Sequence, residues 1–166
     1  MIDSVRAGMV LELLVARQAG VVTREQALRG GHSATTVDLL VRRRRWRPLH
    51  PRVYLVAGYA AGDEARAWAA VLWAGDGVVL SGVAAAWWHG LSASAPAVIG
   101  VTAPVRRAAR PGVSPRCRHL DHADRTELRG LPVTALGLTV LDAAAELGGP
   151  AGELLLRRAL GDIGWA

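Results

Sequence analysis

The stretch VRRRRWRPLHPRVYLV, residues 41–56, decides how the first third of the chain folds. Four consecutive arginines meet a tryptophan, and proline, β-branched and aromatic residues follow. Trp46 to Val56 predicts two short strands around a turn near Pro48–Arg52, because proline is tolerated at the edge or tip of a sheet and not inside it. By itself the arginine run is ambiguous. It can be the solvated end of a helix, where cations favour the C-terminal dipole, or part of a binding surface.

A helix is predicted at the N-terminus, from Val5 to Gln18, with Gly20 ending it. Apolar residues recur along it at spacings of three and four, as they do in a helix with one buried side. We expect that buried side to consist of Met9, Val10, Leu13 and Leu14.

Two shorter helices are predicted next, each with a recognisable N-cap. After the extended link VVT, Thr23 caps the first, with Gln26 as its capping-box partner, and a Gly-Gly pair stops it. Ser33 caps the second, which runs from Ala34 to about Arg44. The order of helix, short helix, helix and β-ribbon is that of a winged helix-turn-helix.

The predicted helix before the arginines is two-sided. Its apolar residues fall on one side: Ala34, Val37, Leu40 and Val41. Its outward side carries Thr35, Thr36, Arg42 and Arg43, together with Leu39. In a winged helix this side faces the major groove of DNA, where threonine can meet a thymine methyl and arginine can bind a guanine edge.

The remaining cationic residues suit contact with the DNA backbone. Arg44, Arg45, Arg47 and Arg52 are predicted phosphate contacts, which position a protein without specifying sequence. His50 is predicted near a phosphate, with a plain surface histidine as the alternative. Trp46 could stack on a base, but a tryptophan at the start of a wing more often anchors the ribbon to the core.

Charge is concentrated in the same part of the chain. Residues 1–59 hold ten arginines and four acidic residues, a net charge of +6, whereas residues 60–166 hold ten of each. A basic surface gathered in one part of a protein indicates a polyanionic partner. The neutral balance of the remainder fits a protein-facing surface better than a second DNA site.

A second unit is predicted after a linker at residues 58–63. It has helices at 64–74, 82–89, 135–147 and 151–160 and strands at 97–104, 113–120 and 128–134, with Ser81 and Thr134 as N-caps. The expected fold is therefore α+β: a winged helix-turn-helix domain at 1–59, followed by a small mixed α/β domain at 64–166.

The composition narrows the setting of the protein. One cysteine excludes an internal disulfide framework and favours a reducing compartment. The N-terminus carries acidic residues and does not match a signal peptide, and no stretch approaches the about 20 apolar residues of a membrane span. We expect a cytoplasmic protein with no membrane partner.

Weaker candidates for chemistry lie in the second unit. The sequence HLDHAD brings His119, Asp121, His122 and Asp124 together, as metal ligands can be, but no second cluster completes a site. A polar loop is the preferred interpretation. The segment WWHG predicts a packed helix end, and Cys117 is expected to be buried in a strand. No catalytic motif stands out, so we expect neither enzymatic activity nor a cofactor or metal.

These motifs carry a resemblance to a known family. VVTREQALRGGHSATTVDLLVRRRRWRPLHPRVYLVAG, residues 21–58, resembles the N-terminal winged-helix domain of AbiEi-type antitoxins, which belong to type IV toxin–antitoxin systems. LSGVAAAWWHGL, VTAP, GLPVT and TVLDAA, between residues 80 and 144, are similar to the domain that follows it in actinobacterial members. The resemblance covers most of the chain.

The resemblance implies a double-stranded DNA-binding transcriptional regulator that represses its own operon. It also implies a partner toxin of nucleotidyltransferase type, bound by the second unit, which could alternatively bind another copy of the chain. Many relatives continue into a very-short-patch-repair-like endonuclease domain. The sequence ends at Ala166, where that domain would begin, so we expect this chain to lack it.

Two departures and two alternatives accompany this reading. Pro51-Arg52 stands where the family has glycine at the wing turn, and Leu138 stands where an arginine is usual. The chain could instead be the DNA-targeting part of a truncated or split endonuclease. It could also be an interaction module that does not bind DNA.

Overall fold

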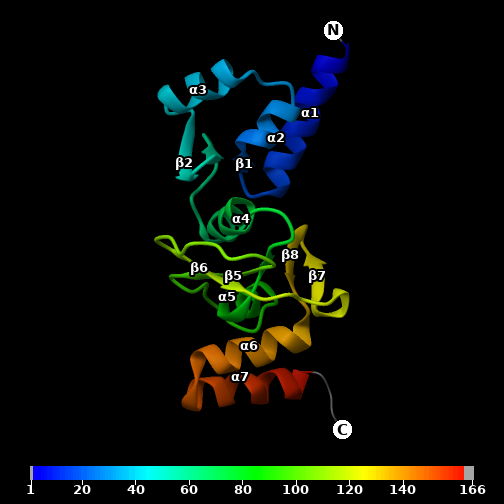
Figure 1. The fold of residues 1–166 in the computed structure, drawn as a ribbon, viewed down its shortest axis with the longest axis vertical. Coiled ribbons are helices and arrows are strands. Elements are labelled where there is room, and N and C mark those ends of the chain that lie inside the picture. The colour runs from blue at the N-terminus through cyan, green and yellow to red at the C-terminus, as the bar shows by residue number, and fades with distance from the viewer. Residues whose placement is uncertain (1, 163–166) are drawn as a thin grey trace. The chain divides into compact units, whose positions relative to one another are not determined.

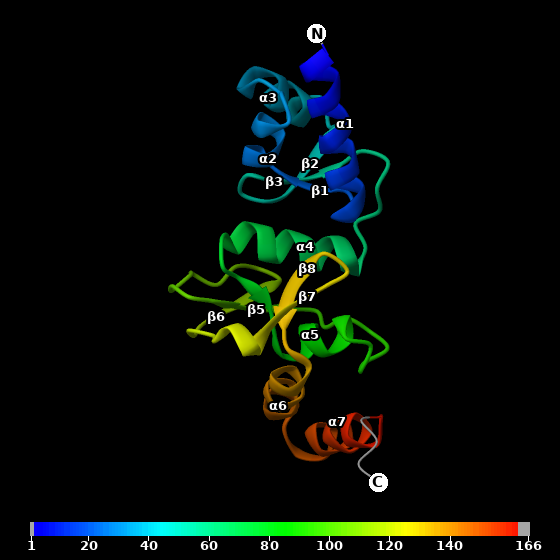
Figure 2. The same ribbon diagram turned by 90° about the vertical axis from the view of Figure 1, so that its right-hand side faces the viewer.

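The structure is a computed structural model that describes residues 2–162, with side chains from 8 to 161 (Figures 1 and 2). It has an α+β fold, as predicted, with helices and two separate sheets. The chain divides into two compact units, residues 1–73 and 74–166. This division groups the helix α4 (Asp63–Ala74) with the first unit, whereas the sequence assigned it to the second.

The first unit follows the order that the sequence predicts. Its elements are α1 (Ile2–Arg17), β1 (Val21–Thr23), α2 (Arg24–Arg29), α3 (Ala34–Arg42), β2 (Trp46–His50) and β3 (Val53–Val56). The link VVT becomes a strand, because β1 pairs antiparallel with β3, and β3 pairs antiparallel with β2. The hairpin β2–β3 is therefore tied into a three-stranded sheet.

The predicted buried side of α1 is wrong for three of its four residues, and only Leu14 is half-buried and packs against the core. Leu11 and Val15 are the buried residues, at 5% and 6% exposure, whereas Met9, Val10 and Leu13 are 58–64% exposed. Both sides of the helix are apolar, so periodicity could not choose between them. The choice comes from tertiary packing, since Gly30 lies so close to Leu11 that a Cβ there would be 2.9 Å from the Leu11 side chain.

One aromatic residue joins the wing to the core of this unit. Trp46 is 6% exposed and packs in a cluster with Leu11, Val37 and Tyr54. Its ring centroid is 5.8 Å from that of Tyr54 and 5.6 Å from that of His32. The interpretation of Trp46 as the anchor of the ribbon is confirmed.

The predicted caps of α2 and α3 are also present. The Thr23 hydroxyl accepts a hydrogen bond from the Gln26 amide at 3.0 Å, and the Gln26 side chain accepts one from the Thr23 amide at 2.9 Å. Ser33 accepts a hydrogen bond from the amide of Thr36 at 3.0 Å. These caps satisfy amides that the first turn of each helix leaves without intrahelical partners.

The second unit is built around a five-stranded mixed sheet in the order β6-β5-β4-β8-β7. Its strands are β4 (Val79–Leu80), β5 (Ile99–Ala103), β6 (Val113–Cys117), β7 (Arg125–Leu128) and β8 (Leu131–Thr134). Its helices are α5 (Gly82–Trp88), α6 (Leu136–Leu147) and α7 (Gly149–Asp162). Figures 1 and 2 show α6 and α7 as neighbours, and α6 also packs against α5.

Four expectations for this unit need correction: one strand, two caps and the burial of Cys117. The segment 128–134 is not one strand. It contains a turn at Arg129–Gly130, where both φ angles are positive, and the missed strand β7 precedes it. Ser81 and Thr134 make no side-chain caps, because their buried hydroxyls bond instead to those of Thr102 and Thr139.

Cys117 is exposed and not buried as expected. It is the last residue of β6, an edge strand that has a neighbouring strand on one side only, so fewer side chains surround it than in a central strand. The segment WWHG is a packed helix end, as predicted: the Trp88 indole donates to the Leu128 carbonyl at 2.9 Å, and the His89 ring lies 2.9 Å from the Thr134 carbonyl.

Candidate nucleic-acid interface

The helix α3 presents its predicted outward residues to solvent. Val37 is fully buried beneath it, while Thr35, Thr36 and Leu39 are exposed. The Thr36 hydroxyl also lies 2.8 Å from the Ser33 hydroxyl, so it takes part in the cap. Ala34, expected on the inner side, is exposed because it occupies the first turn.

The arginine run is not a continuous helix end. The helix stops at Arg42, two residues before the predicted end, and Arg43 is its C-cap. Arg44 then adopts a left-handed conformation with φ of 55°. The Arg44 amide donates to the Val41 carbonyl at 3.0 Å and the Arg45 amide to the Leu40 carbonyl at 2.9 Å. This pair of bonds is a Schellman motif, which turns the chain sharply at its left-handed residue.

The turn at the tip of the wing also uses a left-handed arginine. Strands β2 and β3 meet across Pro51 and Arg52, with His50 opposite Val53 and an irregularity in register at Leu49. Proline fixes φ near −65°, and Arg52 has φ of 64°, a combination typical of a type II turn. Arg52 thus stands where such a turn favours glycine.

A positioning pair that the sequence did not reveal connects these parts. Arg24, the first residue of α2, donates a hydrogen bond of 2.6 Å to the Asp38 carboxylate on α3. The amide of Arg24 donates to the Arg52 carbonyl in the wing turn at 2.8 Å. One residue therefore contacts both α3 and the wing. Arg24 and Asp38 are 14 positions apart, and no spacing rule links them.

The same contact shifts both groups electrostatically. The hydrogen bond from Arg24 lowers the pKa of Asp38, and the charge of Arg24 and of nearby Arg42 adds to this effect. The hydrogen bonds of Arg24 to Asp38 and Tyr54 raise the pKa of the Arg24 guanidinium. Both groups stay charged at neutral pH, so the one acidic residue of α3 is neutralised by a partner and does not oppose an anionic ligand.

The cationic side chains of this region form an exposed set that we call the arginine surface. Its members are Arg42, Arg43, Arg44, Arg45, Arg47 and Arg52. None of the six lies in an ion pair with a carboxylate within residues 8–161. They belong to α3, its C-terminal turn and the hairpin β2–β3, which follow one another directly (Figure 1).

His50 differs from the other predicted contacts. Its side chain is half-buried, and its ring centroid lies 5.6 Å from that of Trp73 on α4. This contact between two tilted rings gives His50 a packing role that the sequence does not suggest.

Other kinds of site find little support in the described part of the chain. Residues 8–161 hold no group of three histidine, cysteine or acidic side chains placed to bind a metal, and His122 and Asp124 lie in a short 3-10 turn. No described helix is long and apolar enough to cross a membrane. No protein-family model matches the chain, and no curated protein matches it either.

Proposed function

We propose that the chain is a sequence-specific DNA-binding protein whose residues 2–56 act as a winged helix-turn-helix. The observation that carries this proposal is the arginine surface: six exposed arginines on α3, its C-terminal turn and the hairpin, without carboxylate partners within residues 8–161. A duplex carries about one negative charge per 1.7 Å of its axis, and such a set of cations suits it.

In this proposal α3 enters the major groove. Thr35 and Thr36, in its first turn, and Arg42 and Arg43, at its end, contact base edges. Arg44, Arg45, Arg47 and Arg52 bind phosphates on either side. The Arg24–Asp38 pair, with the bond from Arg24 to the wing turn, keeps the spacing between helix and wing constant. His50 supports the wing through Trp73 and is left out of the phosphate contacts.

A binding assay tests the proposal. The full chain is titrated into labelled duplex taken from upstream of its own reading frame, with an unrelated duplex as competitor. Replacing Arg42 and Arg43 together by alanine removes two proposed groove contacts, each worth about 1–3 kcal/mol, so specific affinity should fall at least about thirtyfold.

The matched control replaces Arg157 and Arg158 on α7, two exposed arginines outside the arginine surface. This variant has the same net charge as the first. Equal loss of affinity in the two variants would refute the assigned surface. Absence of binding by the unaltered chain to any duplex would favour an interaction module that does not bind DNA.

The finer biological role rests on the resemblance to AbiEi-type antitoxins. We propose that the protein represses its own operon and that residues 74–166 bind a cognate toxin. Several leucines exposed on α6 and α7 support a protein-facing surface there: Leu136, Leu141, Leu147, Leu154 and Leu160. The test is co-expression with the neighbouring reading frame. A toxic product that the chain neutralises supports the antitoxin role, and an endonuclease activity in that product supports the DNA-targeting alternative.

A further inference from the structure

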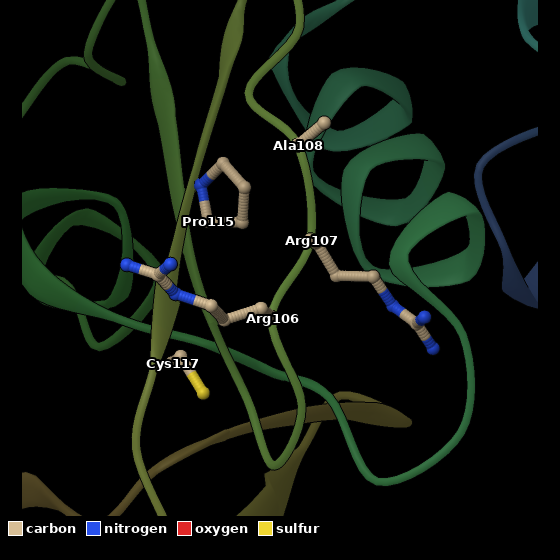
Figure 3. Close-up of a pocket in the computed structure, with 5 residues that line it drawn as sticks. All are labelled: Arg106, Arg107, Ala108, Pro115 and Cys117. Atoms are coloured by element: carbon tan, nitrogen blue, oxygen red, sulfur yellow. The ribbon is translucent and has the colours of Figure 1, made fainter.

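A groove in the second unit lies outside the proposed DNA surface. It has a volume of about 720 Å³ and lies between β6 and the segment that follows β5. Its lining residues are Arg106, Arg107, Ala108, Pro115 and Cys117. Figure 3 shows the Arg106 side chain running toward β6, where Pro115 and Cys117 lie, while Arg107 extends the opposite way.

The groove sits in a stretch of chain with only one sign of charge. Residues 77–120 contain no aspartate or glutamate and five arginines: Arg106, Arg107, Arg110, Arg116 and Arg118. The small net charge of the second unit, nine arginines against eight acidic residues, hides this separation, because seven of those acidic residues come after residue 120. A net charge near zero is therefore compatible with a local anion site.

Two of these arginines are neutralised by α6. Arg116 pairs with Glu146 at 2.9 Å, and Arg118 pairs with Asp142 at 3.3 Å. Since side chains alternate along a strand, Pro115 and Cys117 point to the other face of β6 from Arg116. The carboxylates of α6 thus pair with arginines on one face of β6, and the groove lies on the other face.

The arginines of the groove have different surroundings. Arg107 donates through Nε to the carbonyl of Ala74 at 2.9 Å, which fixes the segment after β5. Arg106 is exposed, and neither arginine is ion-paired with a carboxylate within residues 8–161. The half-buried Pro115 and the exposed Ala108 add apolar atoms to the lining of the groove that Arg106 also lines.

We propose that this groove binds a nucleotide phosphate, with Arg106 contacting the phosphate and Pro115 contacting the apolar face of the base. A guanidinium matches the geometry of phosphate oxygens, and the volume suits a ligand of nucleotide size. The phosphate can come from a free nucleotide or from a nucleic-acid strand. Neither source requires the arginine surface of the first unit.

The chain contains its own reporter for this test. Cys117 is its one cysteine, and it is exposed in the groove. A thiol-reactive maleimide dye labels the full chain there, and the labelling rate is measured with AMP, with adenosine, with inorganic phosphate and with a short duplex. A bound phosphate ligand should slow labelling at least about threefold at saturation, whereas adenosine should not.

Two variants decide which residue is responsible. Arg106→Gln should raise the ligand concentration needed for protection by about tenfold, since it removes a charge-assisted hydrogen bond. Arg157→Gln, on α7, should leave protection unchanged. Circular dichroism checks that both variants fold.

The result also identifies the source of the phosphate. Protection by AMP alone indicates a free nucleotide, and protection by the duplex that Arg106→Gln abolishes indicates a DNA strand. The proposal is overturned if no phosphate ligand slows labelling, or if protection persists unchanged in Arg106→Gln. DNA binding through the first unit is scored separately by gel shift, so the two proposals can fail independently.

Discussion

Two arginines of the proposed DNA surface have backbone conformations that suit glycine better. Arg44 has φ of 55° at the end of α3, and Arg52 has φ of 64° in the wing turn. The left-handed region costs a residue with a Cβ about 1–2 kcal/mol. Residues in sparsely populated conformations cluster at functional sites. These two side chains lie at the end of α3 and in the wing turn. Their positions fit a role in which the arginine charge contributes more to DNA binding than the backbone strain costs in stability.

The substitution Arg44→Gly separates the two effects. It relieves the strained φ but adds backbone entropy to the unfolded chain, so the free energy of unfolding should rise by about 0.5–1 kcal/mol. DNA affinity should fall, because a phosphate contact is lost. Urea denaturation and duplex titration measure the two quantities.

The neighbouring Arg43→Gly is the matched control. Its φ is −79°, which an arginine adopts without strain. This variant should lose about 0.5–1 kcal/mol of stability while removing the same charge. Equal destabilisation by both substitutions would show that strain at Arg44 is absent.

A pH dependence follows from the contact between Arg24 and Asp38. The folded protein holds the pKa of Asp38 below its ordinary value, so the unfolded chain takes up a proton there first as the pH falls. The stabilisation by Asp38 is therefore complete above the ordinary carboxyl pKa of about 3.9 and disappears as the pH falls through the lowered value.

Comparing the unaltered chain with Asp38→Asn tests this dependence. The variant should be the less stable protein near neutral pH, and the difference should shrink toward zero in strong acid. Urea denaturation at both pH values gives the two differences. If the two proteins differ in stability by the same amount in acid and at neutral pH, the charge of the Asp38 carboxylate does not contribute to its interaction with Arg24.

At the scale of an element, α1 has two apolar sides and buries only one of them. Leu11→Ala should cost about 2–4 kcal/mol, because it leaves a cavity in the core beside Trp46. Leu13→Ala, two residues on and 62% exposed, should change stability by less than about 0.5 kcal/mol. Thermal denaturation of the two variants compares their stabilities. A larger loss of stability for Leu13→Ala would show that the side predicted from the sequence is the buried one.

The features predicted correctly from the sequence are those that depend on residues close together in the chain. The caps at Thr23 and Ser33 each join a residue to its third neighbour, so the sequence predicts both N-caps and, for Thr23, also its partner Gln26. Ser81 and Thr134 carry the same kind of signal, but partners distant or buried in the fold take their hydroxyls. The strand β7 was missed because its sequence RTEL is polar and lacks the alternation of a half-buried strand.

For the candidate site, the sequence predicts which side chains are exposed, and the structure shows the contacts that hold them in place. The exposed threonines and arginines of α3 and the hairpin were all predicted from the two-sided helix and the ribbon. The Schellman turn, the Arg24–Asp38 pair and the ring contact of His50 with Trp73 each depend on backbone geometry or on long-range contact. No pattern of spacing encodes them.

At the scale of the whole molecule, charged residues are concentrated in local regions that the net charge of each unit does not reveal. The first unit exposes the arginine surface, and its one acidic residue on α3 is paired. The second unit has a net charge of only +1, yet its residues 77–120 carry five arginines and no acidic residue. The two regions are predicted to bind phosphate independently of each other.

The salt dependence of DNA binding tests the central claim most directly. The dissociation constant for a duplex is measured by fluorescence anisotropy over a range of salt concentrations for the unaltered chain and for a variant with Arg44→Ala and Arg47→Ala. Each lost phosphate contact should reduce the slope of log affinity against log salt by about 0.9, so the variant should lose nearly two units. The Arg157→Ala, Arg158→Ala control should keep the slope of the unaltered chain. A slope equal in all three proteins would contradict the assignment of the arginine surface to the DNA backbone.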